Sequence, residues 1–429
     1  MTLRDEVTAL LQALLRFDTV NPPGNETQAA ELLRDYLAGS GVECELLARE
    51  PHRANLVARI RGGDGPSLGF LSHTDTVLAD RAEWDRDPWS GDLVDGEIWG
   101  RGALDMKDQV AASTVAFASL AREGVRLSGD LLLIVVADEE VGAGYGLSWL
   151  VEAHPEAARC DYAINEGGGD RLVVGGAPVY LCATAEKMSA PFTVRVHGRS
   201  GHASMPGIGD NALVKAARYL EALGAYEPPR ELIPEAKGLL EATLGEAPPL
   251  DEALARAREV HPMLAGLVEP LLAFTLSPTM IDASHQRNVI PALCEITVDC
   301  RLLPETTPAD VEPLIRAALG NGDYDLEFLE AVGGTRSPLD TPLWAALERF
   351  TAAIEPGASL APMACPGFTD SHYLRQAFGT VAYGFFPIRS MDPELATKLI
   401  HSANERIPVD DLELGVDMLR SAARSLLAS

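Results

Sequence analysis

The stretch LLLIVVADEEVG, residues 131–142, places six consecutive apolar residues almost directly before three carboxylates. A short apolar run of this kind is typical of a β-strand that is buried on both faces, as strands are in α/β sheets. Asp138, Glu139 and Glu140 follow with no Lys or Arg among them. Because clustered carboxylates repel one another and lose hydration on burial, a fold that keeps them needs a positive partner at the end of this strand.

Outward from this strand, the first 187 residues alternate between helical and strand patterns. We predict helices at about 2–16, 25–39, 108–122 and 145–153, and strands at about 55–60, 68–72 and 161–165. A turn falls in the NPPGNE segment near the N-terminus. Strands that alternate with helices indicate an α/β fold, with a mostly parallel sheet covered by helices.

The pattern changes after Lys187. From 188 to 331 the order is strand, helix, strand, strand, helix, strand, with an extra helical and proline-punctuated stretch at about 225–275 whose role stays open. This order is the split βαβ pattern of a small two-layer domain. From 332 onward the sequence returns to helices and buried strands. We therefore predict one α/β domain, residues 1–187 and 332–429, interrupted by a smaller domain at 188–331.

Charge and composition exclude some classes of partner. The chain of 429 residues carries 63 acidic and 35 basic residues, for a formal net charge of −28, which argues against nucleic acid and anionic membranes. No apolar run is long enough to span a membrane, and the start of the chain lacks a signal-peptide pattern, so we expect a cytoplasmic protein. The six cysteines form no CxxC pair and are expected to be reduced thiols.

Residues of the types that bind metals follow several of the predicted strands and loops. The segments are LGFLSHTDTV with His73 and Asp75, GRGALDMKD with Asp105, CDYAINEGGG with Glu166, and HSANERIP with His401. Taken alone, each segment has an ordinary reading as a hydrogen-bonded strand end, a turn or a solvated loop. Because the carboxyl ends of parallel strands meet at one edge of a sheet, the segments together predict a metal site. Imidazole and carboxylate ligands without thiolate favour zinc, with cobalt and manganese as alternatives.

These motifs resemble, in order and spacing, the zinc peptidase family of carboxypeptidase G, aminoacylase, acetylornithine deacetylase and succinyl-diaminopimelate desuccinylase. The resemblance spans nearly the whole chain, and its motifs are SHTDTV, GRGALDMKDQ, DEEVG, HGRSGHAS, RNVIP, DCRLLP, GFTDS and HSANERIP. It implies an α/β catalytic domain, an inserted ferredoxin-like lid through which two chains form a homodimer, and two zinc ions per chain. The ligand set that it implies is a bridging Asp105, His73 with Glu166 at one metal, and Glu140 with His401 at the other.

The resemblance also implies roles around these ligands. Asp75 would hydrogen-bond the second nitrogen of His73 and fix its tautomer. Glu139 would be the general base that takes a proton from a metal-bridging water and later gives it to the leaving amine. The family further suggests a cis peptide between Asp105 and Met106. Relatives differ in having Asp where this chain has Glu166, and both side chains offer hard oxygen ligands.

Lid and loop residues would complete the site. By the family pattern, His202 in HGRSGHAS would stabilise the oxyanion, often from the partner subunit, whereas His197 in the same segment reads as structural. Asn288 and Arg301 match substrate-binding positions, and an Arg fork suits a substrate carboxylate. The ordinary reading of Arg301 is a salt bridge at a strand end. Gly367 would offer backbone contact in a substrate loop that Thr369 and Asp370 would shape.

We therefore expect a two-metal amidohydrolase that cleaves the amide bond of an N-acyl amino acid or a short peptide. One alternative is a dipeptidase or aminopeptidase on the same metal core, which would need a free N-terminus. A third reading, from another class, is a metal-dependent binding protein without turnover. The presence of Glu139 and the five ligands argues against that third reading.

Overall fold

The computed structural model describes residues 2–329 and 332–427. The chain forms two compact units, of which the larger comprises residues 1–184, 337–363 and 369–429. The smaller unit comprises residues 185–336 and 364–368. The predicted end of the inserted domain, at 331, lies outside the described residues. None of the described helices has the length and apolar composition that crossing a membrane requires.

The larger unit is built on a mixed sheet with the strand order β1-β2-β6-β3-β7-β18-β9-β17, to which β8 adds beside β9. The strands are β1 (Cys44–Ala48), β2 (Ala54–Ile60), β3 (Leu68–His73), β6 (Leu131–Val136), β7 (Tyr162–Asn165), β8 (Arg171–Val174), β9 (Ala177–Glu186), β17 (Ser359–Cys365) and β18 (Val381–Gly384). The α/β class predicted from the sequence is confirmed.

Parallel pairs lie at the centre of this sheet. Strands β6, β3, β7 and β18 are parallel neighbours, whereas β1 with β2, β2 with β6, and β9 with both β8 and β18 pair antiparallel. Residues 49–53 join β1 to β2, which suffices for a hairpin but not for the crossover that parallel strands need. The central parallel strands are the ones whose carboxyl ends carry the predicted ligands.

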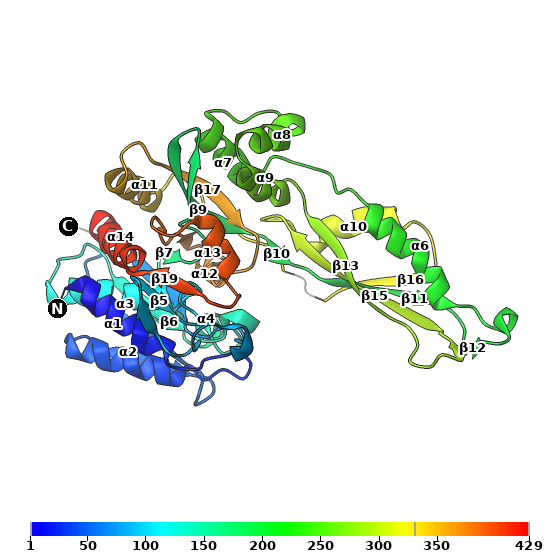
Figure 1. Ribbon diagram of the computed structural model, residues 1–429, viewed down its shortest axis with the longest axis horizontal. Coiled ribbons are helices and arrows are strands. Elements are labelled where there is room, and N and C mark those ends of the chain that lie inside the picture. The colour runs from blue at the N-terminus through cyan, green and yellow to red at the C-terminus, as the bar shows by residue number, and fades with distance from the viewer. Residues whose placement is uncertain (1, 330–331, 428–429) are drawn as a thin grey trace. The chain divides into compact units, whose positions relative to one another are not determined.

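Strand β6 shows how helices cover both faces of the sheet. In β6, Leu131, Leu133 and Val135 face the cluster formed with helices α1 (Leu3–Leu15), α2 (Thr27–Gly39), α3 (Lys107–Arg122) and α14 (Val409–Leu427), which Figure 1 shows lying together. The alternate residues Leu132, Ile134 and Val136 face a second cluster with α4 (Leu147–Ala153), α5 (Pro155–Ala158) and α12 (Ser371–Phe378). Both faces of β6 are therefore buried, as its apolar sequence predicts.

A small three-stranded sheet brings the C-terminal motif to the site. It has the order β19-β5-β4, formed by β4 (Asp92–Val94), β5 (Glu97–Trp99) and β19 (Arg406–Pro408). The pairing of β19 with β5 places the segment around His401 beside the 100–106 loop. The remaining α-helices among the described residues of the larger unit are α11 (Pro342–Ile354) and α13 (Pro393–Leu399), which ends just before His401.

The smaller unit has the predicted split βαβ order. Its sheet runs β13-β15-β11-β16, with β10 also on β15, and α6 and α10 pack with it. Its elements are β10 (Met188–Ser189), β11 (Phe192–His197), α6 (Ala212–Ala225), β13 (Thr275–Asp282), β15 (Leu293–Leu302), α10 (Pro308–Leu319) and β16 (Tyr324–Phe328). All the strand pairs in this sheet are antiparallel. This is the ferredoxin-like arrangement that the resemblance implies.

The 225–275 stretch of the smaller unit forms α7 (Pro234–Leu244), α8 (Leu250–Val260) and α9 (Pro262–Val268). Its end is tied to the start of the unit, because the Nζ of buried Lys187 donates to the carbonyls of Pro270 at 2.7 Å and Ala273 at 3.0 Å. The six cysteines are free, in keeping with the sequence expectation of reduced thiols.

Candidate metal centre

The predicted ligands of the larger unit gather at the carboxyl ends of three neighbouring parallel strands. His73 is the last residue of β3, Glu139 and Glu140 follow β6, and Glu166 follows β7. Asp105 comes from the loop before α3, and its peptide bond to Met106 is cis, as the resemblance suggested. Since parallel neighbours end at the same edge of the sheet, residues distant in sequence become adjacent here.

Two ligand groups form, and Asp105 touches both. His73, Glu139 and Glu166 make one group, and Asp105, Glu140 and His401 make the other, with the ligand atoms of each group within 4.8 Å of one another. The Nε2 of His73 lies 3.3 Å from Oδ1 of Asp105 and 3.6 Å from Oε2 of Glu166. The Nε2 of His401 lies 3.0 Å from the other oxygen, Oδ2, of Asp105 and 3.4 Å from Oε2 of Glu140. One carboxylate thus faces two imidazoles through its two oxygens.

The donor set suits divalent cations. Two buried atoms of types that can ligate a metal, Nε2 of His73 and Oε1 of Glu140, have no hydrogen-bond partner. The site is rich in carboxylates, which outnumber its two imidazoles. Four carboxylates and two imidazoles, with no thiolate, form the ligand chemistry of zinc, cobalt or manganese sites. The residues of the two groups therefore fit divalent metal ions of this kind.

The pKa shifts show the same imbalance of charge. Burial and the neighbouring Glu166 raise the pKa of Glu139 well above its ordinary value. Burial also raises the pKa of Glu166 to about 7. The carboxylates of Asp105 and Glu140 raise the pKa of His401 to about 10. A cation at this position competes with these protons, so metal binding and protonation are coupled.

Asp75 supports the site without reaching its centre. The Nδ1 of His73 lies 3.1 Å from the backbone oxygen of Asp75 and 3.5 Å from its carboxylate. The same carboxylate accepts the backbone N–H groups of Glu139 and Glu140, both at 3.1 Å. Asp75 therefore holds one predicted ligand and the backbone of two more acidic residues at the same time.

Glu405 is a supporting residue that the sequence reading missed. It is fully buried, and its carboxylate accepts the backbone N–H groups of Leu104 at 2.7 Å and Asp105 at 3.1 Å. It also accepts from Nη1 of Arg101 at 2.6 Å. Glu405 thereby fixes the loop that presents Asp105. The available signal was its place four residues after His401 in the same motif.

Asp370 is a second acidic group whose surroundings the sequence did not indicate. It is buried at the start of α12, and neither carboxylate oxygen has a hydrogen-bond partner. Burial raises the pKa of Asp370 well above its ordinary value, and the negative charge of Glu166 adds to the rise. The sequence had placed Asp370 only in a substrate loop with Gly367. Gly367 lies in the smaller unit, where a Cβ at its position would meet nothing within 4 Å.

Besides Gly367, three predicted lid residues, His202, Asn288 and Arg301, lie in the smaller unit. His202 belongs to the short strand β12 (Gly201–His202), which pairs with β14 (Val289–Ile290), so that Ala203 N donates to the carbonyl of Asn288 at 3.0 Å. The structure thus brings His202 and Asn288 close together. Arg301 on β15 holds Asp299 through two bonds of 3.0 Å, so its guanidinium fork already faces a carboxylate.

With this geometry established, the family of the chain follows from its sequence match. Residues 69–425 match the family described as peptidase family M20/M25/M40. The chain belongs to this family. The matched span includes every predicted site residue, from His73 to His401. Together with the two ligand groups, membership makes the chain a metal-dependent hydrolase that acts on amide bonds.

Known proteins resemble the chain over nearly its full length. A succinyl-diaminopimelate desuccinylase from Cereibacter sphaeroides is 27% identical over 419 residues, covering 94% of each chain. An M20 family metallo-carboxypeptidase from Sulfolobus solfataricus shares the fold, with a TM-score of 0.74, 20% identity and coverage of 98% and 99%. A dinuclear metal-binding M20 peptidase from Bacillus subtilis shares it with a TM-score of 0.64, 13% identity and coverage of 99% and 98%.

Proposed function

We propose that this M20 hydrolase is a two-zinc amidohydrolase that cleaves the amide bond of N-acyl amino acids or short peptides. The observation that carries the proposal is the position of Asp105 between His73 and His401, with Glu139 beside the same ligands. His73 and Glu166 would hold one ion, Glu140 and His401 the other, and Asp105 both. When bound, the two ions polarise the scissile carbonyl and lower the pKa of the attacking water.

In this proposal Glu139 moves the proton. Its carboxylate takes one proton from the attacking water and delivers it to the amide nitrogen as the C–N bond breaks. The products are a carboxylic acid and a free amine, so water is the only other reactant. The burial of Glu139 supports this role, because it raises the pKa of the carboxylic acid that forms after proton transfer toward a range useful for donation.

The smaller unit is proposed as the inserted lid, with boundaries near 188 and 331. The tautomer of His202 supports the proposal that this residue stabilises the oxyanion. Its Nδ1 accepts the backbone N–H of Ser204 at 3.2 Å, which leaves the proton on Nε2, free to donate. Arg301 would exchange Asp299 for the α-carboxylate of the substrate, while Asn288 and Gly367 would contact the substrate.

A dipeptidase or aminopeptidase is the second candidate, and the same metal core supports it. The two candidates differ in the group attached to the nitrogen side of the substrate. We would incubate zinc-loaded protein with N-acetyl and N-succinyl amino acids and with unblocked dipeptides that release the same amino acid. The desuccinylase relatives make the succinyl set a necessary part of this panel.

The release of amino acid from each substrate class decides between the candidates. Turnover of the acylated set supports a deacylase and contradicts an aminopeptidase. Turnover of the dipeptides alone contradicts the deacylase proposal. The matched variant is Arg301→Leu, which should raise KM for substrates with a free α-carboxylate and leave KM for their amidated counterparts nearly unchanged.

A homodimer through the smaller unit is also proposed. Helix α6 packs against β13 and exposes Val214, while β13 exposes Met280 and Ile281. Within the described residues β13 pairs with β15 alone, so its outer edge offers unpaired backbone groups. An apolar face beside a free strand edge suits pairing with a second copy of the chain.

A further inference from the structure

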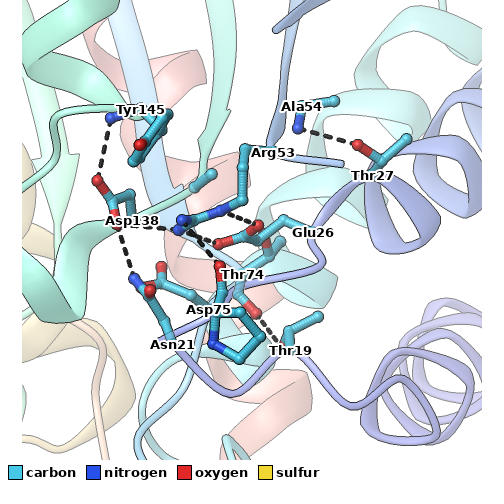
Figure 2. Close-up of polar contacts among 12 residues, drawn as sticks. Thr19, Asn21, Glu26, Thr27, Arg53, Ala54, Thr74, Asp75, Asp138 and Tyr145 are labelled. Carbon is cyan, nitrogen blue, oxygen red and sulfur yellow. Dashed lines mark hydrogen bonds and ion pairs between the residues drawn. The ribbon is translucent and has the colours of Figure 1, made fainter. Parts of the chain in front are cut away.

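The NPPG segment at residues 21–24 enters the larger unit more deeply than its reading as a turn suggested. Asn21 is buried, and its backbone N–H donates to the carbonyl of Thr76 at 2.9 Å. The hydroxyl of Thr19 donates to the carbonyl of Thr74 at 2.7 Å, as Figure 2 shows. Residues 19–21 are thus fastened to the segment that follows β3, the strand that carries His73.

The side chain of Asn21 lies between two buried carboxylates. Its Nδ2 donates to Oδ2 of Asp75 at 2.9 Å and to Oδ1 of Asp138 at 2.8 Å (Figure 2). An amide nitrogen has two hydrogens, and both are used. The reversed orientation would point the amide oxygen at two anions, so the contacts determine which way the amide faces.

Both carboxylates control the chain that carries Glu139 and Glu140. Asp75 accepts the backbone N–H groups of these two residues. Asp138 directly precedes them, turns the chain with a left-handed φ of 67°, and accepts the backbone N–H of Tyr145 at 3.0 Å. The amide of Asn21 therefore donates a hydrogen bond to Asp138, where the turn begins, and one to Asp75, which binds the backbone of Glu139 and Glu140.

A buried arginine completes the arrangement from the other side. Arg53 donates to Asp138 at 2.9 Å and binds Glu26 through two bonds of 2.6 and 2.7 Å (Figure 2). One guanidinium thus serves two carboxylates, whereas Asp75 faces Nδ1 of His73 at 3.5 Å. Without the N–H groups of Asn21, Asp75 and Asp138 would face each other with less compensation for their buried charge.

We propose that Asn21 is a positioning residue that joins Asp75 to Asp138 and so holds Glu139 and Glu140 in place at the metal centre. The inference rests on the proposed function, since it assigns a purpose to a geometry that the two metals and the base require. Groups behind metal ligands that fix their orientation typically change metal affinity or activity 10- to 100-fold when replaced. Asn21 acts one step further back, through carboxylates that touch the ligand-bearing backbone.

The test compares two variants of the full chain with a control. Asn21→Asp keeps the shape but sets a third carboxylate against Asp75 and Asp138. Asn21→Ser keeps one donor, adds no charge and leaves room for water, so it serves if the first variant does not fold. The control is Leu347→Ala, a buried core change on α11 that supplies no side chain to the site. Each protein is assayed for kcat and KM, for zinc affinity against a competing chelator, and for the absorption spectrum of its cobalt form.

Asn21→Ser should lower kcat about 10-fold or more with KM within about 3-fold, and Asn21→Asp should lower it further. Both should weaken zinc binding and shift the cobalt bands, whereas Leu347→Ala should lower only the melting temperature. Asn21 variants that behave like Leu347→Ala would overturn the inference. If wild-type protein binds cobalt but hydrolyses no substrate, the proposed function fails, and the zinc affinities and cobalt spectra still decide the role of Asn21.

Discussion

Asp105 illustrates how a single residue organises the centre. Each of its oxygens faces a different imidazole. One oxygen lies beside the fully buried His73, and the other lies beside the half-exposed His401. Although burial alone would raise its pKa, the adjacent imidazoles of His401 and His73 lower the pKa of Asp105. The carboxylate is therefore ionised at neutral pH, the state in which it can bind two cations. Its backbone in turn depends on Glu405.

Replacement of Glu405 by Gln should destabilise the protein by about 3–5 kcal/mol, because Arg101 would keep a buried charge without its partner. The measurement is the shift of the urea unfolding midpoint. The control is Glu413→Gln, which removes a partly exposed partner of Arg4 and should cost about 1 kcal/mol or less. Equal shifts in the two variants would show that the buried pair does not stabilise the 100–106 loop.

At this scale the sequence pointed to the candidate ligands and to one supporting residue, Asp75, but not to the supports Asn21 and Glu405. His73, Glu139, Glu140 and Glu166 could be predicted because each ends or follows a recognisable strand in a motif with the right chemistry. Asn21 and Glu405 could not, because the groups that they bind lie on segments distant in sequence. Apart from Arg101, the donors to Glu405 are backbone N–H groups, which residues of almost any type can supply, so the sequence does not reveal them.

At the scale of elements, the apolar runs predicted the central parallel strands. They predicted the direction in which the strands pair only in part. The sequence predicted a mostly parallel sheet, whereas the outer strands pair antiparallel. Strand direction depends on which neighbour a strand meets, and this is settled by packing of the whole sheet. The helices at 234–268 were likewise recognised as helical, but their attachment to Lys187 required the structure.

Lys187 makes the stability of the smaller unit depend on pH. Burial lowers the pKa of Lys187 to about 8 from an ordinary value of 10.5. Below pH 8 the folded protein must bury the charge, and between pH 8 and 10.5 the unfolded chain binds more protons than the folded one. The free energy of unfolding should therefore rise by about 2 kcal/mol from pH 7 to pH 10 through this group alone.

Unfolding of wild-type protein and Lys187→Met should be compared across that pH range. The difference between their free energies of unfolding should change in favour of the wild type as pH rises. A constant difference would contradict the pKa assigned to Lys187. Both proteins are best compared in the zinc-loaded form, so that the two samples do not differ in metal content.

For the whole molecule, the ligands come from five separate stretches between residues 73 and 401. Most of the larger unit must therefore fold before the centre exists. Long-range assembly of this kind also explains why the proposed roles rest on the resemblance. The sequence alone indicated which residue types were present, and the family pattern implied how they would pair. The lid residues His202, Asn288 and Arg301 stay predictions in their catalytic roles.

The proposed homodimer gives a prediction at the same scale. Ile281→Arg together with Val214→Glu should place charges on the exposed face of α6 and β13 and yield monomers. Sedimentation velocity of wild-type and variant protein measures the outcome. Val173→Arg, which changes an exposed apolar residue of the larger unit, should leave the dimer intact. A wild-type protein that sediments as a monomer would contradict the proposal.

The most direct test of the account is zinc-dependent hydrolysis by wild-type protein and Glu139→Gln. Chelator-treated protein would receive zinc in steps while amino acid release from the best substrate of the panel is followed. We predict that wild-type activity appears with added zinc and reaches its plateau at two equivalents per chain. Glu139→Gln should bind the same two equivalents and turn over at least about 100-fold more slowly. Full activity without metal, or equal turnover by the two proteins, would contradict a two-metal site with Glu139 as its base.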